Sequence, residues 1–229
     1  MPHCQKIIAI DGPSASGKGT IAAQVAKKLG FVYLDSGALY RVCALSCLDQ
    51  QIDLDDRDAV ATIAQSLPVQ FKEQCIFLND QDITNRIRDE NIGKAASKIA
   101  TYPQLREALL TRQRAFLTTQ GLVADGRDMG SVVFPNAALK VFLTASAEVR
   151  AQRRVIQLQK INLPANFSEI LSDIKKRDWD DSHRSIAPLK HFPDARFLDS
   201  SEYTIEQTVD QVLRWYQETQ QKIQENRKR

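Results

Sequence analysis

Long apolar runs are absent from this sequence of 229 residues. Its longest apolar stretches, such as Ile7–Ile10, are far shorter than the ~20 residues that a transmembrane helix needs. Before Asp11 the chain also lacks the apolar stretch and small-residue cleavage site of a secretory signal. We therefore expect a cytoplasmic protein that does not associate with membranes.

Cysteine, histidine and aromatic residues are scarce, and the charge is nearly balanced. The 4 cysteines and 3 histidines form no Cys-x-x-Cys pair and no cluster, which disfavours both a zinc site and a disulfide framework. Cys43 and Cys47 share one face of an expected helix, so we interpret them as reduced packing residues. A net charge of +3 and 7% aromatic residues do not indicate nucleic-acid binding, whereas a small anionic substrate remains compatible.

Hydrophobic residues make up 43% of the chain, which is enough for a substantial core. Helical patterns separate short apolar runs of the kind that form buried strands. These runs are Lys6–Ile10, Phe31–Leu34, Leu122–Ala124, Leu139–Leu143 and Ala195–Leu198. The alternation predicts an α/β domain with a mainly parallel, five-stranded sheet flanked by helices. Thr204 and Gln207 form a capping box that predicts a long amphipathic C-terminal helix.

Two stretches interrupt this alternation. From about residue 52 to residue 102 the sequence predicts a polar helix, two short strands (Val69–Lys72 and Cys75–Asn79) and a helix near Asn91–Ala100. Together they indicate an inserted subdomain. Between residues 152 and 188 charged residues dominate. This second stretch is either a mobile cover over an anion or an ordinary solvated helix face, and charge alone favours the solvated face.

A glycine-rich segment follows the first predicted strand and opens the first predicted helix, the context in which the pattern G-x-x-x-x-G-K-[ST] binds phosphate. It consists of Gly12, Pro13, Ser14, Ala15, Ser16, Gly17, Lys18, Gly19 and Thr20. Small residues let successive backbone N–H groups point at phosphate oxygens. Lys18 would reach the β- and γ-phosphates of ATP, and Thr20 offers a hydroxyl to Mg²⁺. Because Gly19 occupies the usual Ser/Thr position, the assignment of Thr20 is the weaker one.

A phosphate loop alone leaves several classes of protein open, and a glycine-rich turn with a chance lysine is the simplest alternative. The sequence has no Asn-Lys-x-Asp motif, with which a regulatory GTPase reads guanine. Motors and translocases usually need a longer chain or more domains. The Gly-Lys-Gly-Thr form, in a short chain with two insertions, resembles the nucleoside monophosphate kinases.

More specific matches lie at predicted strand ends and in the charged stretch. They are Leu34–Arg41 (LDSGALYR), Ala95–Ser97, Arg106–Leu110, Ala124–Gly130 (ADGRDMG), Arg177–Arg184 (RDWDDSHR) and Ala187–Leu189. In this order they closely resemble the bacterial cytidylate kinases, from about Ile7 to Val212, which is most of the chain. Ala15 departs from the family, which often has glycine there, and alanine would be strained if this position needs a positive φ.

The resemblance implies a single domain with a P-loop kinase fold, an NMP-binding insert and a LID. The core would comprise residues 1–40, 103–151 and 189–229, the insert residues 41–102, and the LID residues 152–188. It also implies a monomeric enzyme of pyrimidine nucleotide metabolism, whose partners are the small molecules ATP and CMP or dCMP. With Mg²⁺, it would phosphorylate CMP to CDP by direct in-line transfer. The alternatives are a P-loop kinase of another small acceptor, such as UMP or AMP, and a nucleotide-binding switch without transfer.

The resemblance further assigns residues to the acceptor nucleotide. The cytosine base would be read by Ser97, Arg106 and Asp128. Asp128 could accept from the N4 amino group, whereas Arg106 and Ser97 could donate to the acceptors on the same edge. The acceptor phosphate would be bound by Ser36, Arg41, Arg127 and Arg184, and the sugar by Arg177 and Asp181. The alternative for Asp128 is a turn aspartate that caps the next segment.

Phosphoryl transfer needs positioning and positive charge rather than a protein nucleophile. With the assignments that the resemblance implies, the catalytic residues are expected to be Lys18, Arg127 and Arg184. Asp35 and Asp125 follow apolar runs and are candidates to contact metal-bound water or the arginines. For Asp125, a turn residue that ends a strand is an equally good interpretation.

Overall fold

A computed structural model describes residues 6–72, 75–160 and 162–227. The chain forms two compact units, which are treated separately below. The first unit comprises residues 1–34 and 116–229, and the second unit comprises residues 35–115. None of the helices within the described ranges is long and apolar enough to cross a membrane.

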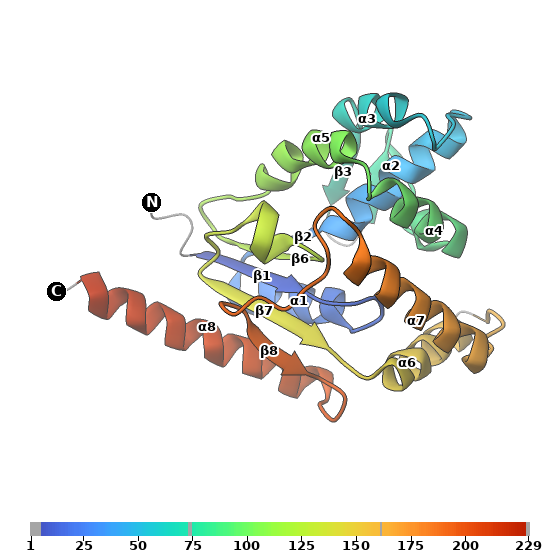
Figure 1. The fold of residues 1–229 in the computed structure, drawn as a ribbon. Helices are drawn as coiled ribbons and strands as arrows, with labels where there is room; N and C mark the ends of the chain where they lie inside the picture. The colour runs from blue at the N-terminus through green and yellow to red at the C-terminus, as the bar shows by residue number, and fades with distance from the viewer. Residues whose placement is uncertain (1–5, 73–74, 161, 228–229) are drawn as a thin grey trace. The chain divides into compact units, whose positions relative to one another are not determined.

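The first unit is built on a parallel sheet with the strand order β2-β6-β1-β7-β8 (Figure 1). The strands are β1 (Ile7–Asp11), β2 (Val32–Asp35), β6 (Leu122–Gly126), β7 (Leu139–Thr144) and β8 (Arg196–Asp199). They coincide with the five predicted apolar runs to within one or two residues, which confirms the predicted α/β fold. The register pairs Asp11 of β1 with Gly126 of β6. The carboxyl ends of these two strands therefore meet at the edge where open α/β sheets bind ligands.

Helices flank the sheet of the first unit. They are α1 (Lys18–Leu29), the π-helix η3 (Met129–Val133), α6 (Ala147–Gln159), α7 (Phe167–His183) and α8 (Ile205–Arg227). The predicted capping box precedes α8: the backbone N–H of Thr204 donates to Gln207 Oε1 at 2.9 Å, and that of Gln207 donates to Thr204 Oγ1 at 3.2 Å. Helices α6 and α7 occupy most of the charged stretch and pack against each other, with Ile174 of α7 buried.

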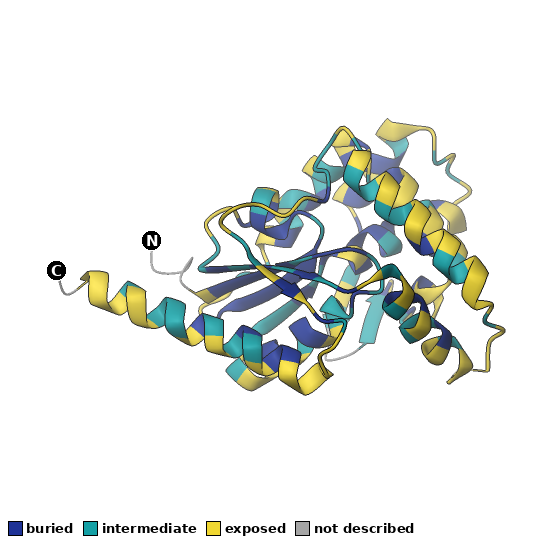
Figure 2. Cartoon of the chain, turned by 60° about the horizontal axis from the view of Figure 1, so that its bottom comes forward, coloured by how far each residue is buried: buried dark blue, intermediate teal, exposed yellow. Residues whose placement is uncertain are grey.

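Alternation along β1 sends its side chains to opposite faces of the sheet. Ile8 and Ile10 are fully buried on one face, where they form a core cluster with α1 and α8. Figure 2 shows the strands of the parallel sheet as the buried centre of the first unit, whereas α8 has an exposed outer side. Each of these isoleucines contributes about 1.5–3 kcal/mol through burial. Asp11 lies on the opposite face, where its carboxylate contacts the start of η3.

The second unit combines helices with a small antiparallel sheet. Its elements are α2 (Ser36–Asp49), α3 (Arg57–Gln65), β3 (Val69–Lys72), β4 (Cys75–Leu78), β5 (Gln81–Asp82), η2 (Arg86–Arg88), α4 (Glu90–Ile99) and α5 (Pro103–Arg114). Both predicted strands are present, but β4 ends before Asn79, because Asn79 and Asp80 have φ angles of 49° and 62° and turn the chain toward β5. Cys43 and Cys47 are buried in α2 as free thiols, which confirms their packing role.

Candidate active site

The backbone between β1 and α1 forms a concave loop. Ala15 and Gly17 have φ angles of 57° and 86°. Left-handed residues that alternate with others in a loop can turn successive N–H groups toward one anion. Gly12 has no room for a side chain, since a Cβ there would lie 2.0 Å from the carbonyl oxygen of Leu143. Gly17 is the N-cap of α1 and has no side chain that could occupy the first N–H groups of the helix. These donors are available to an anion.

Side chains of the loop also fit an anion. The hydroxyl oxygens of Ser14 and Ser16 are buried and have no hydrogen-bond partner among the described residues. A buried polar group without a partner costs about 1–3 kcal/mol, which a phosphate oxygen could recover by accepting from it. Lys18 Nζ lies 3.1 Å from the carbonyl oxygen of Pro13, so the ammonium group is folded back over the loop. The loop therefore suits the phosphates of a nucleotide.

Ala15 occupies the strained position that the family resemblance indicated. Its φ of 57° lies in the left-handed region, where a Cβ costs about 1–2 kcal/mol. Gly17 adopts the same region without that cost. The loop keeps its concave shape with alanine at this position, at some cost in stability.

Two arginines of α6 donate hydrogen bonds to backbone carbonyl oxygens of the loop. Neither arginine was assigned to the loop from the sequence alone. Arg150 Nη1 donates to the carbonyl oxygen of Ser14 at 3.1 Å, while its guanidinium makes a two-pronged contact with Asp178 at 3.0 and 2.5 Å. Arg153 Nη1 donates to the carbonyl oxygen of Ser16 at 3.4 Å. The Arg150 side chain is 5% exposed, so its guanidinium group is buried between the loop and Asp178 rather than solvated.

Three positive groups of the first unit converge on one carboxylate. Arg127 Nε donates to Asp181 Oδ2 at 2.6 Å, and Arg184 Nη1 lies 3.8 Å from Asp181 Oδ1. Burial acts to raise the pKa of Asp181, but Arg127, Arg184 and the ammonium group of Lys18 outweigh it and hold the pKa below its usual value. Arg177 lies one helical turn before Asp181, on the same face of α7. The structure thus brings these predicted residues together beside the loop.

Asp128 begins η3 and is 4% exposed. Its side chain makes no capping hydrogen bond to η3, so the structure contradicts the interpretation of Asp128 as a capping residue. Instead, the Asp11 carboxylate accepts from the backbone N–H groups of Met129 at 2.7 Å and Gly130 at 2.8 Å. Burial raises the pKa of Asp11 to about 6, although these two hydrogen bonds and Lys18 lower it.

The other two aspartates have different local roles. Asp125 is 4% exposed and lies within β6 rather than in a turn after it. Its Oδ1 accepts from the hydroxyl group of Tyr33 at 2.7 Å. Asp35 is the N-cap of α2 and accepts from the backbone N–H of Ala38 at 2.9 Å. Both carboxylates therefore have protein partners.

In the second unit, two predicted site residues meet at Gly93 of α4. Ser97 Oγ donates to the carbonyl oxygen of Gly93 at 3.0 Å. The Arg41 guanidinium lies so close to Gly93 that an added Cβ would be 3.0 Å from Nη2. Arg41 Nη1 also donates to the carbonyl oxygen of Ile87 at 2.8 Å. A residue larger than glycine at position 93 would displace this arginine.

Arg106 and Ser36 are fixed by neighbours within the same unit. Arg106 Nη1 donates to the carbonyl oxygen of Ala100 at 3.1 Å, and its guanidinium lies 5.8 Å from the ring centre of Tyr40. Ser36 is 2% exposed, and its hydroxyl accepts from Gln113 Nε2 at 2.9 Å. Both side chains thus have defined orientations.

Among the described residues, no group of 3 or more His, Cys, Asp or Glu side chains could hold a metal ion. Mg²⁺ commonly takes its oxygens from substrate phosphates and water, with only one or two protein groups. Thr20 is exposed in the first turn of α1, next to the loop. The residues present therefore fit an ion that arrives on the phosphates of a nucleotide.

Comparison with known proteins identifies the family. A sequence profile described as cytidylate kinase matches residues 8–218. The chain is 54% identical over 216 residues to a cytidylate kinase of Burkholderia pseudomallei, covering 94% of this chain and 95% of that one. It is also 54% identical over 215 residues to a cytidylate kinase of Neisseria gonorrhoeae, covering 93% and 97%. The shikimate kinase structure from Bacteroides thetaiotaomicron aligns over 92% of this chain and 98% of its own, with a TM-score of 0.43 and 11% identity. By its sequence, this chain belongs to the cytidylate kinase family.

Proposed function

We propose that this protein, acting as a cytoplasmic monomer, transfers the γ-phosphoryl group of ATP to the phosphate of CMP or dCMP. The products are ADP and CDP or dCDP. The observation that carries the proposal is the convergence of Lys18, Arg127 and Arg184 beside a concave loop of backbone donors. Two nucleotide phosphates repel each other, and positive groups placed between them lower the free energy of approach and of the transition state.

The loop would hold the donor. Its backbone N–H groups, with the hydroxyls of Ser14 and Ser16, would donate to the β- and γ-phosphates of ATP. Lys18 would follow the γ-phosphate as a mobile point charge. Thr20 would contribute an oxygen to Mg²⁺, which when bound neutralises part of the phosphate charge.

The arginines would hold the acceptor phosphate. Planar guanidinium groups bind phosphate oxygens in a two-pronged manner, so Arg41, Arg127 and Arg184 suit this role, with Ser36 as a further donor. In the transfer, an oxygen of the CMP phosphate forms a bond to the γ-phosphorus as the bond to the bridging oxygen of ADP breaks. No protein nucleophile takes part. We propose that residues 41–102 act as the NMP-binding insert and residues 152–188 as a LID that excludes water from the reaction.

Side chains that bind the base and the sugar would select the acceptor nucleotide. Asp128 would accept from the N4 amino group of cytosine, and Arg106 and Ser97 would donate to the other acceptors on that edge. Uracil has a carbonyl at this position, which would face the buried carboxylate and leave it unpaired. Arg177 and Asp181 would bind the sugar hydroxyls. CMP should therefore be preferred to UMP.

The change Asp128→Ala tests the assignment of base reading. We expect the ratio of kcat/KM for CMP to that for UMP to fall by at least ~10-fold, because the hydrogen bond that distinguishes the bases is lost. The KM for ATP should change by less than about 2-fold, since the loop is untouched. Asp194→Ala is the control, because Asp194 is an exposed carboxylate paired with Lys140. An unchanged ratio in a folded Asp128 variant would show that another group reads the base.

A further inference from the structure

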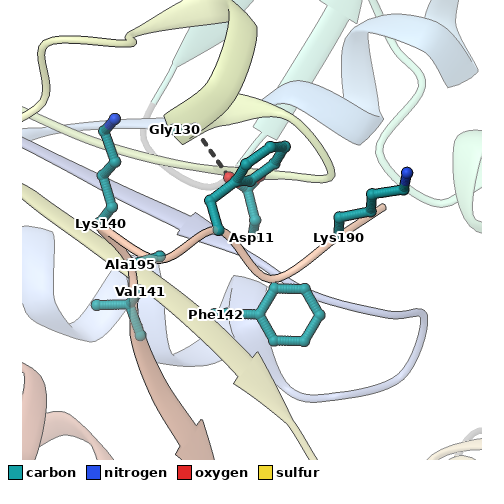
Figure 3. Close-up of a pocket in the computed structure, with 8 residues that line it drawn as sticks. Asp11, Gly130, Lys140, Val141, Phe142, Lys190 and Ala195 are labelled. Carbon is teal, nitrogen blue, oxygen red and sulfur yellow. Dashed lines mark hydrogen bonds between the residues drawn. The ribbon is translucent and has the colours of Figure 1, made fainter. Parts of the chain in front are cut away.

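Asp11 is a partly buried carboxylate to which the proposed mechanism gives no part. It ends β1, and each of its oxygens accepts from a different backbone donor: Oδ1 from Met129 at 2.7 Å and Oδ2 from Gly130 at 2.8 Å. Figure 3 shows the bond to Gly130 among the residues that line a pocket, which include Lys140 and Lys190. This pocket has a volume of about 10 Å³. A carboxylate that accepts from two consecutive N–H groups fixes both the position and the tilt of that turn.

The turn that Asp11 fixes carries two proposed site residues. Arg127 and Asp128 immediately precede Met129, so the two hydrogen bonds restrain the backbone just after them. The turn is also closely packed. A Cβ at Gly126 would lie 2.9 Å from the Met129 side chain, and one at Gly130 would lie 3.2 Å from the Lys140 side chain. Little room remains for the turn to move while these contacts persist.

The backbone of Asp11 itself is held independently of its carboxylate. Asp11 is paired in register with Gly126 of β6 and with Phe142 of β7, so a strand on each side fixes its main chain. A change confined to the side chain should therefore leave the start of the phosphate loop in place. The same change removes half of the anchorage of the turn, because an asparagine amide has one acceptor oxygen where the carboxylate has two.

We propose that Asp11 is a positioning residue for acceptor recognition: its carboxylate sets the turn that aims Arg127 at the acceptor phosphate and Asp128 at the cytosine base. The inference rests on the proposed function, since it assumes those roles for Arg127 and Asp128. It predicts that a change at Asp11 weakens the binding of the acceptor nucleotide much more than the binding of ATP.

Asp11→Asn tests this separation. We expect the KM for CMP to rise at least ~10-fold and the CMP-to-UMP ratio of kcat/KM to fall by a similar factor, while the KM for ATP changes less than about 3-fold. The matched control is Asp199→Asn, because Asp199 ends β8 and accepts from the backbone N–H of Ser201 at 2.9 Å in a different turn. That control should leave the CMP-to-UMP ratio unchanged. A loss of activity in which the KM for CMP and the KM for ATP rise by the same factor would overturn the proposal.

Backbone amide hydrogen exchange tests the anchorage without relying on activity. In the unmodified protein without nucleotide, the amides of Met129 and Gly130 should exchange slowly, and in Asp11→Asn at least ~10-fold faster. Fast exchange of both amides in the unmodified protein would contradict the proposal even if the variant did not fold. If Asp128→Ala leaves selectivity intact, the base-reading role is wrong. If Asp128→Ala lowers selectivity and Asp11→Asn does not, only the positioning role is wrong.

Discussion

Replacing Lys18 by methionine is expected to lower kcat at least ~100-fold while the fold is retained. Methionine has a similar length but no charge, so the variant removes the ammonium group that lies 3.1 Å from the Pro13 carbonyl oxygen above the loop. Negative charge spreads over the transferred phosphoryl oxygens in the transition state, and a cation that follows the transferred group stabilises this state more than it stabilises bound ATP. The effect should therefore fall mainly on kcat.

The matched control for Lys18 lies on the same helix. Lys27 is exposed in the last turn of α1, so Lys27→Met makes the same chemical change away from the loop. The kcat of the two variants is compared by steady-state kinetics. Circular dichroism and thermal melting establish that both variants are folded. A folded Lys18→Met protein with near-normal turnover would reject the role of Lys18.

Replacing Arg184 by methionine is expected to slow phosphoryl transfer about 10³-fold or more, as with other arginines that stabilise this transition state. The Arg184 side chain is 9% exposed, and it is oriented by donation from Nε to the Ala187 carbonyl oxygen at 2.7 Å and by Asp181. A guanidinium held in this way is already in place when charge develops, so little reorganisation is needed. Single-turnover kinetics with saturating nucleotides measure the chemical step directly.

The exposed Arg214 of α8 provides the control for Arg184. Arg214→Met should leave the transfer rate within about 2-fold of the unmodified protein, as surface changes away from a site usually do. If Arg184→Met raised only the KM for ATP and left the transfer rate intact, Arg184 would belong to the donor side. That outcome would contradict the proposal that Arg184 stabilises the phosphoryl group during transfer.

The elements with strong local signals could be predicted from the sequence. The short apolar runs mark the five strands of the first unit to within one or two residues, because buried parallel strands are apolar on both faces. The capping box at Thr204 and Gln207 forms both of its predicted hydrogen bonds. Ala15 has a positive φ, which is the condition under which alanine was expected to be strained.

Features that depend on tertiary packing could not be predicted in this way. No spacing rule marks Arg150 as a partner of the Ser14 carbonyl oxygen, since the two residues lie 136 positions apart in sequence. The anchoring of Met129 by Asp11 spans 118 positions and has no local signature either. From the sequence, such residues look like a solvated arginine and a strand-end aspartate. Their burial and their partners follow only from the packed structure.

The central claim is that a cytosine nucleotide is the preferred phosphoryl acceptor, and the most direct measurement is ADP release from MgATP with CMP, dCMP, UMP, AMP and GMP in turn. We predict the highest kcat/KM with CMP or dCMP, at least ~10-fold above UMP, with CDP or dCDP as the product. Equal or greater activity with UMP or AMP would contradict the proposed base recognition. ADP release that no acceptor stimulates would contradict phosphoryl transfer to a nucleotide.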